Sequence, residues 1–215
     1  MTEHAFYSRM RQMPLTSLCR HWFLFLGIAF LTGCASLTPW VKATSSKPYQ
    51  DNARRFTATL PDGWMRCNLF DYFLLTKDGI VLESIVVERH RVDRKLESTK
   101  KRYQVDMSPE EVAGVEVDAL RTQPGTGNFE LLANEPASVA GQTGFRLEYR
   151  FTYLESGLRI HGILYGLMIV GKESEKNPEK RSWVYGIRYE APDQYYFDRY
   201  KSDFKNFVQS LQVLK

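Results

Sequence analysis

The sequence predicts an α+β fold, an α/β/α sandwich in which a central antiparallel sheet is flanked by helices. Three observations predict it. The run Ile85–Val87 is too continuously apolar for a strand with one solvated face, so we expect helices over both faces of the sheet. Residues 145–153 alternate between apolar and polar side chains, which is the period of a strand. Residues 195–211 carry apolar side chains at helical spacing.

The first half of the domain is predicted to pair short strands. They occupy residues 56–60, 64–69, 73–76 and 80–88, with turns at 61–63 and 77–79. The sequence Ser108-Pro109-Glu110-Glu111 then combines an N-cap Ser, a Pro at the first helical position and a Glu three residues after the cap. A helix is therefore expected to run to about Arg121.

The second half is predicted to be rich in strands. After a loop at 123–128, strands are expected at 145–153, 160–170 and 183–189, with a polar loop at 171–181. Short connections between successive strands require antiparallel pairing. The C-terminal helix, from about Tyr195 to Leu211, is amphipathic and should pack flat on the sheet. Its apolar stripe comprises Phe197, Tyr200, Phe204, Phe207, Val208 and Leu211.

Composition favours one globular domain. The chain has 215 residues, 43% of them hydrophobic and 13% aromatic, which is enough to bury a core without metal or disulfide support. The formal net charge is only +4, and part of it lies in the N-terminal segment. This balance argues against a nucleic-acid partner.

The N-terminal segment has the pattern of a secretory leader. An uncharged run of ten residues, from Trp22 to Leu31, has the length of a signal-peptide core and is too short to span a membrane. It closes on Leu31-Thr32-Gly33-Cys34, which resembles the lipobox of bacterial lipoproteins. The resemblance implies that the Cys34 thiol is lipidated and that acyl chains such as palmitate anchor the protein. It also implies that signal peptidase recognises Leu31, Thr32 and Gly33.

Three segments are therefore expected. Residues 1–33 form the signal peptide, from a start at Met1, Met10 or Met13, and residues 53–215 form a single globular domain. Residues 34–52, rich in Ser, Thr, Pro and Lys, are expected to be the lipidated cysteine and a flexible tether with a span of roughly 25 Å. Ala35 and Ser36 stand where an Asp favours inner-membrane retention, so the resemblance implies the outer membrane, facing the periplasm.

The start of the domain carries a second resemblance. The pattern Phe56-x-Ala58-x-Leu60-Pro61-x-Gly63-Trp64 resembles the first hairpin of the Mog1/PsbP-like fold, and the predicted order of elements over residues 56–211 is similar. The resemblance implies a non-enzymatic assembly factor, adaptor or ligand carrier. It supplies no catalytic residues.

The residues that could carry chemistry are sparse. His90 and His161 lack a second His or Cys at metal-ligand spacing, so we expect no metal or other cofactor. No nucleophile motif is present, and we expect no enzyme. Cys67 has no partner once Cys19 leaves with the leader and Cys34 is acylated. It is interpreted as a buried hydrophobe, with a redox thiol or an intermolecular bridge as the alternatives.

One basic stretch is a possible contact with an anionic surface. It contains Arg89, Arg91, Arg94, Lys95, Lys100, Lys101 and Arg102. Such a run is usually a solvated loop. The functional alternative is contact with anionic lipid headgroups, worth about 1 kcal/mol per cation near the surface.

These observations favour a membrane-anchored, non-catalytic binding or assembly module of the cell envelope, with an envelope protein as partner. One alternative is an envelope hydrolase, which requires His90 or His161 within hydrogen-bond reach of a carboxylate and a hydroxyl in one cleft. Another is a lipid or small-ligand carrier, which requires an apolar pocket of several hundred cubic ångströms between sheet and helix.

Overall fold

A computed structural model describes residues 39–96, 99, 101–171 and 177–214. The predicted signal peptide, the lipidation site at Cys34 and the basic residue Lys100 lie outside the described residues. No helix in the described part of the chain is both long and apolar enough to cross a membrane.

The main sheet has eight strands in the order β1-β4-β5-β6-β10-β9-β8-β7, and every neighbouring pair is antiparallel. The strands are β1 (Trp40–Lys42), β4 (Met65–Cys67), β5 (Phe73–Thr76), β6 (Ser84–Arg91), β7 (Thr126–Val139), β8 (Gln142–Tyr153), β9 (Arg159–Ile169) and β10 (Trp183–Pro192). A smaller sheet has the order β11-β3-β2, with β11 at Gln212–Val213, β3 at Phe56–Ala58 and β2 at Tyr49–Asp51.

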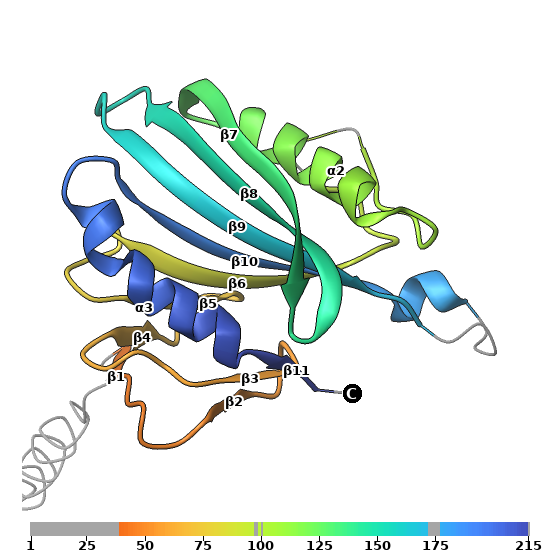
Figure 1. Cartoon of the computed structure of the whole chain (residues 1–215), viewed down its shortest axis with the longest axis horizontal. Helices are drawn as coiled ribbons and strands as arrows, with labels where there is room; N and C mark the ends of the chain where they lie inside the picture. The colour runs from red at the N-terminus through yellow and green to blue at the C-terminus, as the bar shows by residue number, and fades with distance from the viewer. Residues whose placement is uncertain (1–38, 97–98, 100, 172–176, 215) are drawn as a thin grey trace, which may run out of the picture. The chain divides into compact units, whose positions relative to one another are not determined.

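Two α-helices cover opposite faces of the main sheet (Figure 1). Helix α2 (Pro109–Arg121) packs with Phe145, Leu147 and other apolar side chains on one face, and helix α3 (Tyr196–Ser210) packs on the other. A short 3₁₀ helix, η1, occupies Pro178–Arg181. The predicted α/β/α sandwich with a central antiparallel sheet and a C-terminal amphipathic helix is confirmed.

Local signals account for both helices. Ser108 caps α2 as predicted: its hydroxyl accepts from the Glu111 amide, and the Glu111 carboxylate accepts from the Ser108 amide at 2.7 Å. In α3 the apolar stripe is buried, including Phe197, Phe204 and Phe207. This aromatic layer is the centre of the core on that face.

The structure corrects the predicted tether. Residues 40–42 and 49–51 are strands, β1 on the edge of the main sheet and β2 on the edge of the small one. Asp51 is buried and its carboxylate pairs with Arg54. The described domain thus begins by Pro39, and the boundary placed at residue 52 is wrong. The Ser, Thr and Pro composition resembles a linker because these are short edge strands with few apolar positions.

The sequence predicts a loop at residues 123–128, where β7 begins, and predicts no strand over the rest of β7. This strand lies at the sheet edge, most of its side chains are exposed or half-buried, and its pairing with β8 contains register shifts. Neither feature produces the apolar alternation that identifies a strand in a sequence.

Candidate binding groove

A groove of about 720 Å³ lies beside α2, over strands β6 and β10. Its floor carries four polar residues: Glu88, His90, Glu116 and Arg188. Arg94 and Lys95 lie among its lining residues, and Leu96, Ala119 and Leu120 add apolar surface. Helix α2 contacts β7, β8 and β9, and this position leaves the neighbouring part of the sheet uncovered.

Strand periodicity places the polar side chains in the groove. Val87 on β6 and Ile187 on β10 point into the core beneath α3, so their neighbours Glu88 and Arg188 point to the α2 face. His90 follows Glu88 at the same spacing on β6. On this part of the sheet the face that α2 leaves open is therefore lined by charged groups.

Arg188 is the central group of the groove. Its guanidinium lies 3.7 Å from Glu88 and 3.8 Å from Glu190, both longer than a hydrogen bond, and its Nε is buried without a hydrogen-bond partner. The side chain is only 22% exposed. Glu190 and Glu88 raise the pKa of Arg188, against its burial, so it stays charged. Arg188 thus lines the groove with a guanidinium that makes no hydrogen bond within the described residues, and its Nε is enclosed near Glu190.

Glu88 and Arg188 belong to a row of polar side chains on the α2 face of the sheet, which we call the polar strip. Tyr149 and Glu190 extend it. The Tyr149 hydroxyl donates to Glu190 at 2.7 Å, across the intervening strand β9. The ring reaches that far because β9 has glycine at position 162, where a Cβ atom would lie 2.4 Å from the Tyr149 ring. Burial and the nearby Glu190 carboxylate raise the pKa of Tyr149 well above its ordinary value.

The pKa values of the two acidic groups in the groove are shifted in opposite directions. Burial raises the pKa of Glu116, which accepts a hydrogen bond from the Tyr103 hydroxyl. Burial also opposes ionisation of Glu88, but His90 and Arg188 outweigh it and lower the pKa of Glu88. In turn Glu88, 3.6 Å away, raises the pKa of His90.

The structure distributes the predicted basic stretch over different surroundings. Arg89 lies on the α3 side, its guanidinium 3.5 Å from the centre of the Trp183 ring. Arg91 pairs with Asp93, and Lys101 pairs with Asp118. Only Arg94 and Lys95 line the groove, and Arg102 is exposed. Contact of this stretch with anionic lipid stays a prediction.

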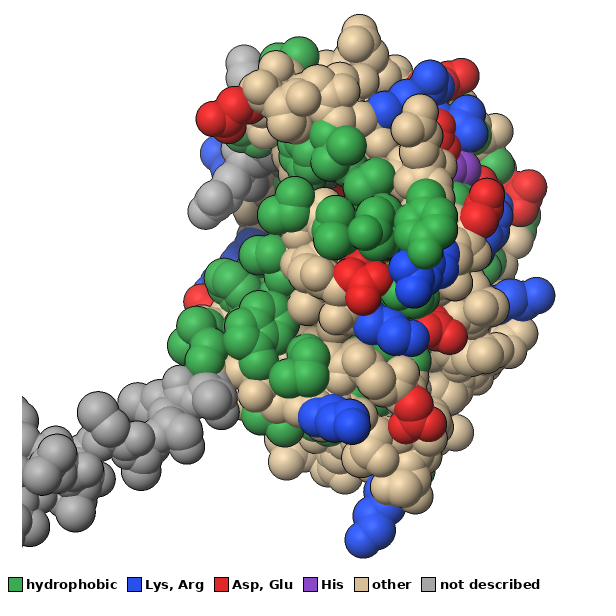
Figure 2. All heavy atoms as spheres, turned by 90° about the vertical axis from the view of Figure 1, so that its left-hand side faces the viewer, with side chains coloured by type: hydrophobic (Ala, Val, Ile, Leu, Met, Phe, Trp, Pro, Cys, Tyr) green, Lys and Arg blue, Asp and Glu red, His purple; other side chains and the backbone are tan. Residues whose placement is uncertain are grey.

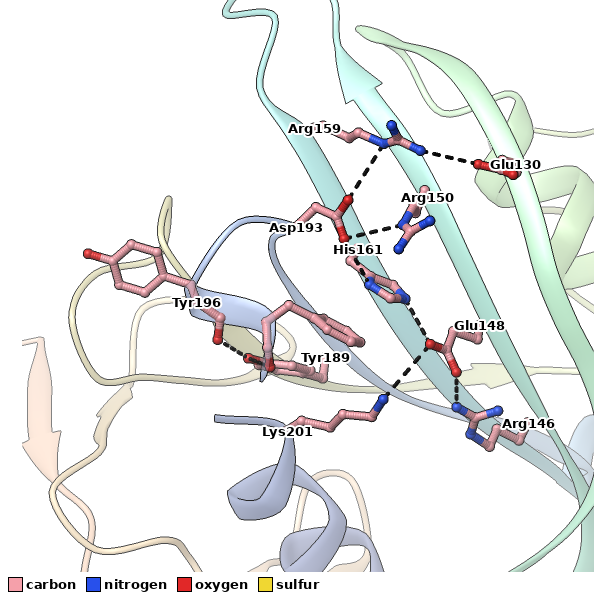
Figure 3. Close-up of polar contacts among 11 residues, drawn as sticks. Glu130, Arg146, Glu148, Arg150, Arg159, His161, Tyr189, Asp193, Tyr196 and Lys201 are labelled. Atoms are coloured by element: carbon pink, nitrogen blue, oxygen red, sulfur yellow. Dashed lines mark hydrogen bonds and ion pairs between the residues drawn. The ribbon is translucent and has the colours of Figure 1, made fainter. Parts of the chain in front are cut away.

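A second polar cluster surrounds His161 on the α3 face (Figure 3). Its Nε2 lies 2.8 Å from Glu148 and its Nδ1 lies 3.1 Å from Asp193. The imidazole stacks on Phe197 with ring centres 3.5 Å apart. The two carboxylates are bound in turn by Arg146, Arg150, Arg159 and Lys201.

This cluster is closed rather than open. His161 is 6% exposed, and both of its ring nitrogens face carboxylates of the same network. Within the described residues neither His161 nor His90 has a hydroxyl as a hydrogen-bond partner, and no group of three or more metal-ligating side chains is assembled. The structure therefore assigns His161 a structural role.

Cys67 is buried and free. It packs with Leu74 and Val86, against which Trp40 and Tyr72 lie. This environment favours the interpretation of Cys67 as a small hydrophobic side chain.

The described domain is an α+β fold with a polar groove beside α2. No protein-family model matches the sequence, and no curated protein matches it. The solution structure of cyanobacterial PsbP (CyanoP) from Synechocystis sp. PCC 6803 is similar, with a TM-score of 0.50 and 14% identity over 84% of this chain and 96% of that one.

The crystal structure of LpqN, involved in cell envelope biogenesis of Mycobacterium tuberculosis, is also similar. Its TM-score is 0.52 and its identity 14%, over 79% of this chain and 90% of that one. At such identities the likeness shows the fold alone. It confirms the PsbP-like fold, but the hairpin expected at residues 56–69 is not formed. Strand β3 pairs with β2 and β11 in the small sheet, whereas β4 pairs with β1 and β5 in the main one.

Proposed function

We propose that this protein is a membrane-anchored lipoprotein of the cell envelope, facing the periplasm, that acts as a non-catalytic binding or assembly module. The groove beside α2 is its binding site. LpqN has the same fold and is involved in cell envelope biogenesis, which supports the proposed location of this protein in the cell envelope.

The observation that carries the proposal is the state of Arg188. A mostly buried guanidinium without a hydrogen bond within 3.5 Å in the described structure faces a groove of about 720 Å³. Because this guanidinium makes only ion pairs longer than 3.5 Å, an anionic group of a ligand or partner that enters the groove can form charge-assisted hydrogen bonds with it. A carboxylate, phosphate or amide oxygen fits this guanidinium, and the nearby Arg94 and Lys95 favour an anionic group.

A small-ligand carrier is the second candidate function. The groove has the volume that a carrier needs, and Leu96 and Leu120 provide apolar surface for part of a ligand. Its charged floor, however, suits an amphiphile better than a wholly apolar molecule. A hydrolase receives less support, because the carboxylates beside the two histidines are not accompanied by a hydrogen-bonded hydroxyl in the described residues.

A bulky side chain placed in the groove tests whether the groove is the binding site. Ala119 lines the groove on α2, so Ala119→Trp should block it. Gln209→Trp is the matched control, because Gln209 lines a groove of about 680 Å³ on the other helix. Material that co-purifies from detergent-solubilised membranes with the wild type should be lost with Ala119→Trp and retained with Gln209→Trp. Equal retention by both variants contradicts a binding site beside α2.

The anchor is tested by intact mass. Protein extracted from membranes should have the mass of the chain from Cys34 plus its acyl groups. A soluble wild-type protein, or an unmodified N-terminus at another residue, contradicts the lipoprotein assignment.

A further inference from the structure

An exposed apolar patch lies where the described chain begins. We call it the entry patch: the exposed side chains of Leu69 and Phe70, with the half-buried Trp40 and Tyr72 near them. Leu69 is 72% exposed, and exposed apolar side chains point to a contact surface where they gather into a patch. Figure 2 shows hydrophobic side chains gathered on the face that adjoins the start of the described chain.

The patch is held in a defined conformation. The Asn68 amide donates to the Pro39 carbonyl at 2.9 Å, which ties the β4–β5 turn to the first described residue. The rings of Phe70 and Tyr72 stack with centres 4.9 Å apart, and Arg54 donates to the Phe70 carbonyl. Leu69 and Phe70 are thus presented by an ordered turn on the same side as the chain start.

The chain start limits how far this patch can lie from a membrane. Only five residues, 35–39, connect Cys34 to the end of Pro39, and a fully extended chain of that length spans at most about 18 Å. We propose, resting on the proposed acylation of Cys34, that the entry patch docks on the lipid bilayer and orients the domain there.

The composition of the patch suits a bilayer surface. Trp and Tyr are enriched at the membrane interface, where an apolar ring and a polar tip are both accommodated, and Leu and Phe gain by leaving water. The nearby charges nearly balance, since Lys42 and Asp71 are both exposed. The contact should therefore be mainly hydrophobic and only weakly sensitive to salt.

The orientation can be tested with a matched pair of cysteine variants of the full chain. Leu69 and Val81 are 72% and 71% exposed, but they lie in turns at opposite ends of β5. Leu69→Cys and Val81→Cys would each carry an environment-sensitive fluorophore, since Cys67 is buried. The acylated protein is reconstituted into vesicles of phosphatidylethanolamine and phosphatidylglycerol, with and without brominated acyl chains.

We expect the label at position 69 to be quenched by the brominated lipid and the label at 81 to be unaffected. Adding Phe70→Asp to the labelled Leu69→Cys variant should lower the quenching several-fold while the acylated mass is unchanged. Equal quenching at both positions, or none at position 69 in acylated protein, overturns the proposal. Shielding of position 69 in native membranes but not in pure-lipid vesicles also overturns it, in favour of a protein occupant.

Failure of the anchor is distinguishable from failure of the patch. If intact mass shows no acylation, the proposed function fails. The same vesicles added to unacylated protein, with Cys19 and Cys34 replaced by Ser so that only position 69 is labelled, then test the patch alone. Quenching at position 69 there supports the lipid contact, and its absence overturns it.

Discussion

Polar side chains have different surroundings on the two faces of the main sheet. Beneath α3 the core is aromatic, and the histidine at its margin, His161, has both ring nitrogens engaged by carboxylates that four cations bind in turn. Beside α2, Arg188 has only long ion pairs and faces an open groove. Titratable residues and buried unpaired donors occur on both faces, with Arg89 Nε on the α3 side among them, so what distinguishes the candidate site is a charged group beside an open groove.

The position of each helix explains this difference. Helix α3 contacts β10, β9 and β3, whereas α2 contacts β7, β8 and β9, so that α3 covers β10 on its face and α2 lies away from β10 on the other. The charged side chains of β6 and β10 on that face consequently remain accessible. Substitutions on the two faces test this difference between them.

Phe204→Ala should be the most destabilising substitution. Phe204 is 1% exposed and stacks with Tyr189 at 5.4 Å, so truncation leaves a cavity and costs about 3 to 5 kcal/mol of unfolding free energy. Leu120→Ala should cost nearer 2 kcal/mol, because the side chain is smaller and, although only 6% exposed, borders the groove on one side. Urea denaturation measures both. A larger cost for Leu120→Ala would show that the α2 face is the more tightly packed one.

Gly162→Ala should disturb the polar strip on the α2 face. Its Cβ would lie 2.4 Å from the Tyr149 ring, so the ring must move and its hydrogen bond to Glu190 is lost, at a cost of about 1 to 3 kcal/mol. Gly186→Ala is the control on the neighbouring strand, where the nearest atom is a Leu164 methyl carbon at 3.4 Å. Similar unfolding free energies for the two variants would mean that Tyr149 does not need the glycine.

Ser108→Ala should destabilise the domain by about 1 kcal/mol, because the Glu111 amide loses its capping acceptor. Glu111→Gln keeps an acceptor for the Ser108 amide and should cost less. A denaturation midpoint for Ser108→Ala equal to that of the wild type would contradict a stabilising cap at this end of α2.

The sequence predicted those features that depend on local patterns. The capping box at Ser108, the stripe of α3 and the alternation of β8 each lie within one segment, and the structure contains all three. The edge strands β1 and β7 lack such a pattern because edges have little to bury. The groove could not be predicted, since Glu88 and Arg188 are a hundred residues apart and only the pairing of β6 with β10 brings them together.

The last prediction concerns pH and has the smallest effect. Glu88 raises the pKa of His90 above its ordinary value of 6.5, with Glu116 adding to this and Arg188 opposing it. A raised folded-state pKa stabilises the fold fully below the unfolded pKa, and this stabilisation is lost as the pH rises through the folded pKa. His90→Gln should therefore cost more unfolding free energy at pH 5 than at pH 8. The difference should stay below about 1 kcal/mol, since His90 and Glu88 are 42% and 34% exposed. Urea denaturation at both pH values measures it.

In a Glu88→Gln background, His90→Gln should show a smaller pH dependence of the unfolding free energy. An unchanged pH dependence would mean that Glu88 is not the group that raises the pKa of His90.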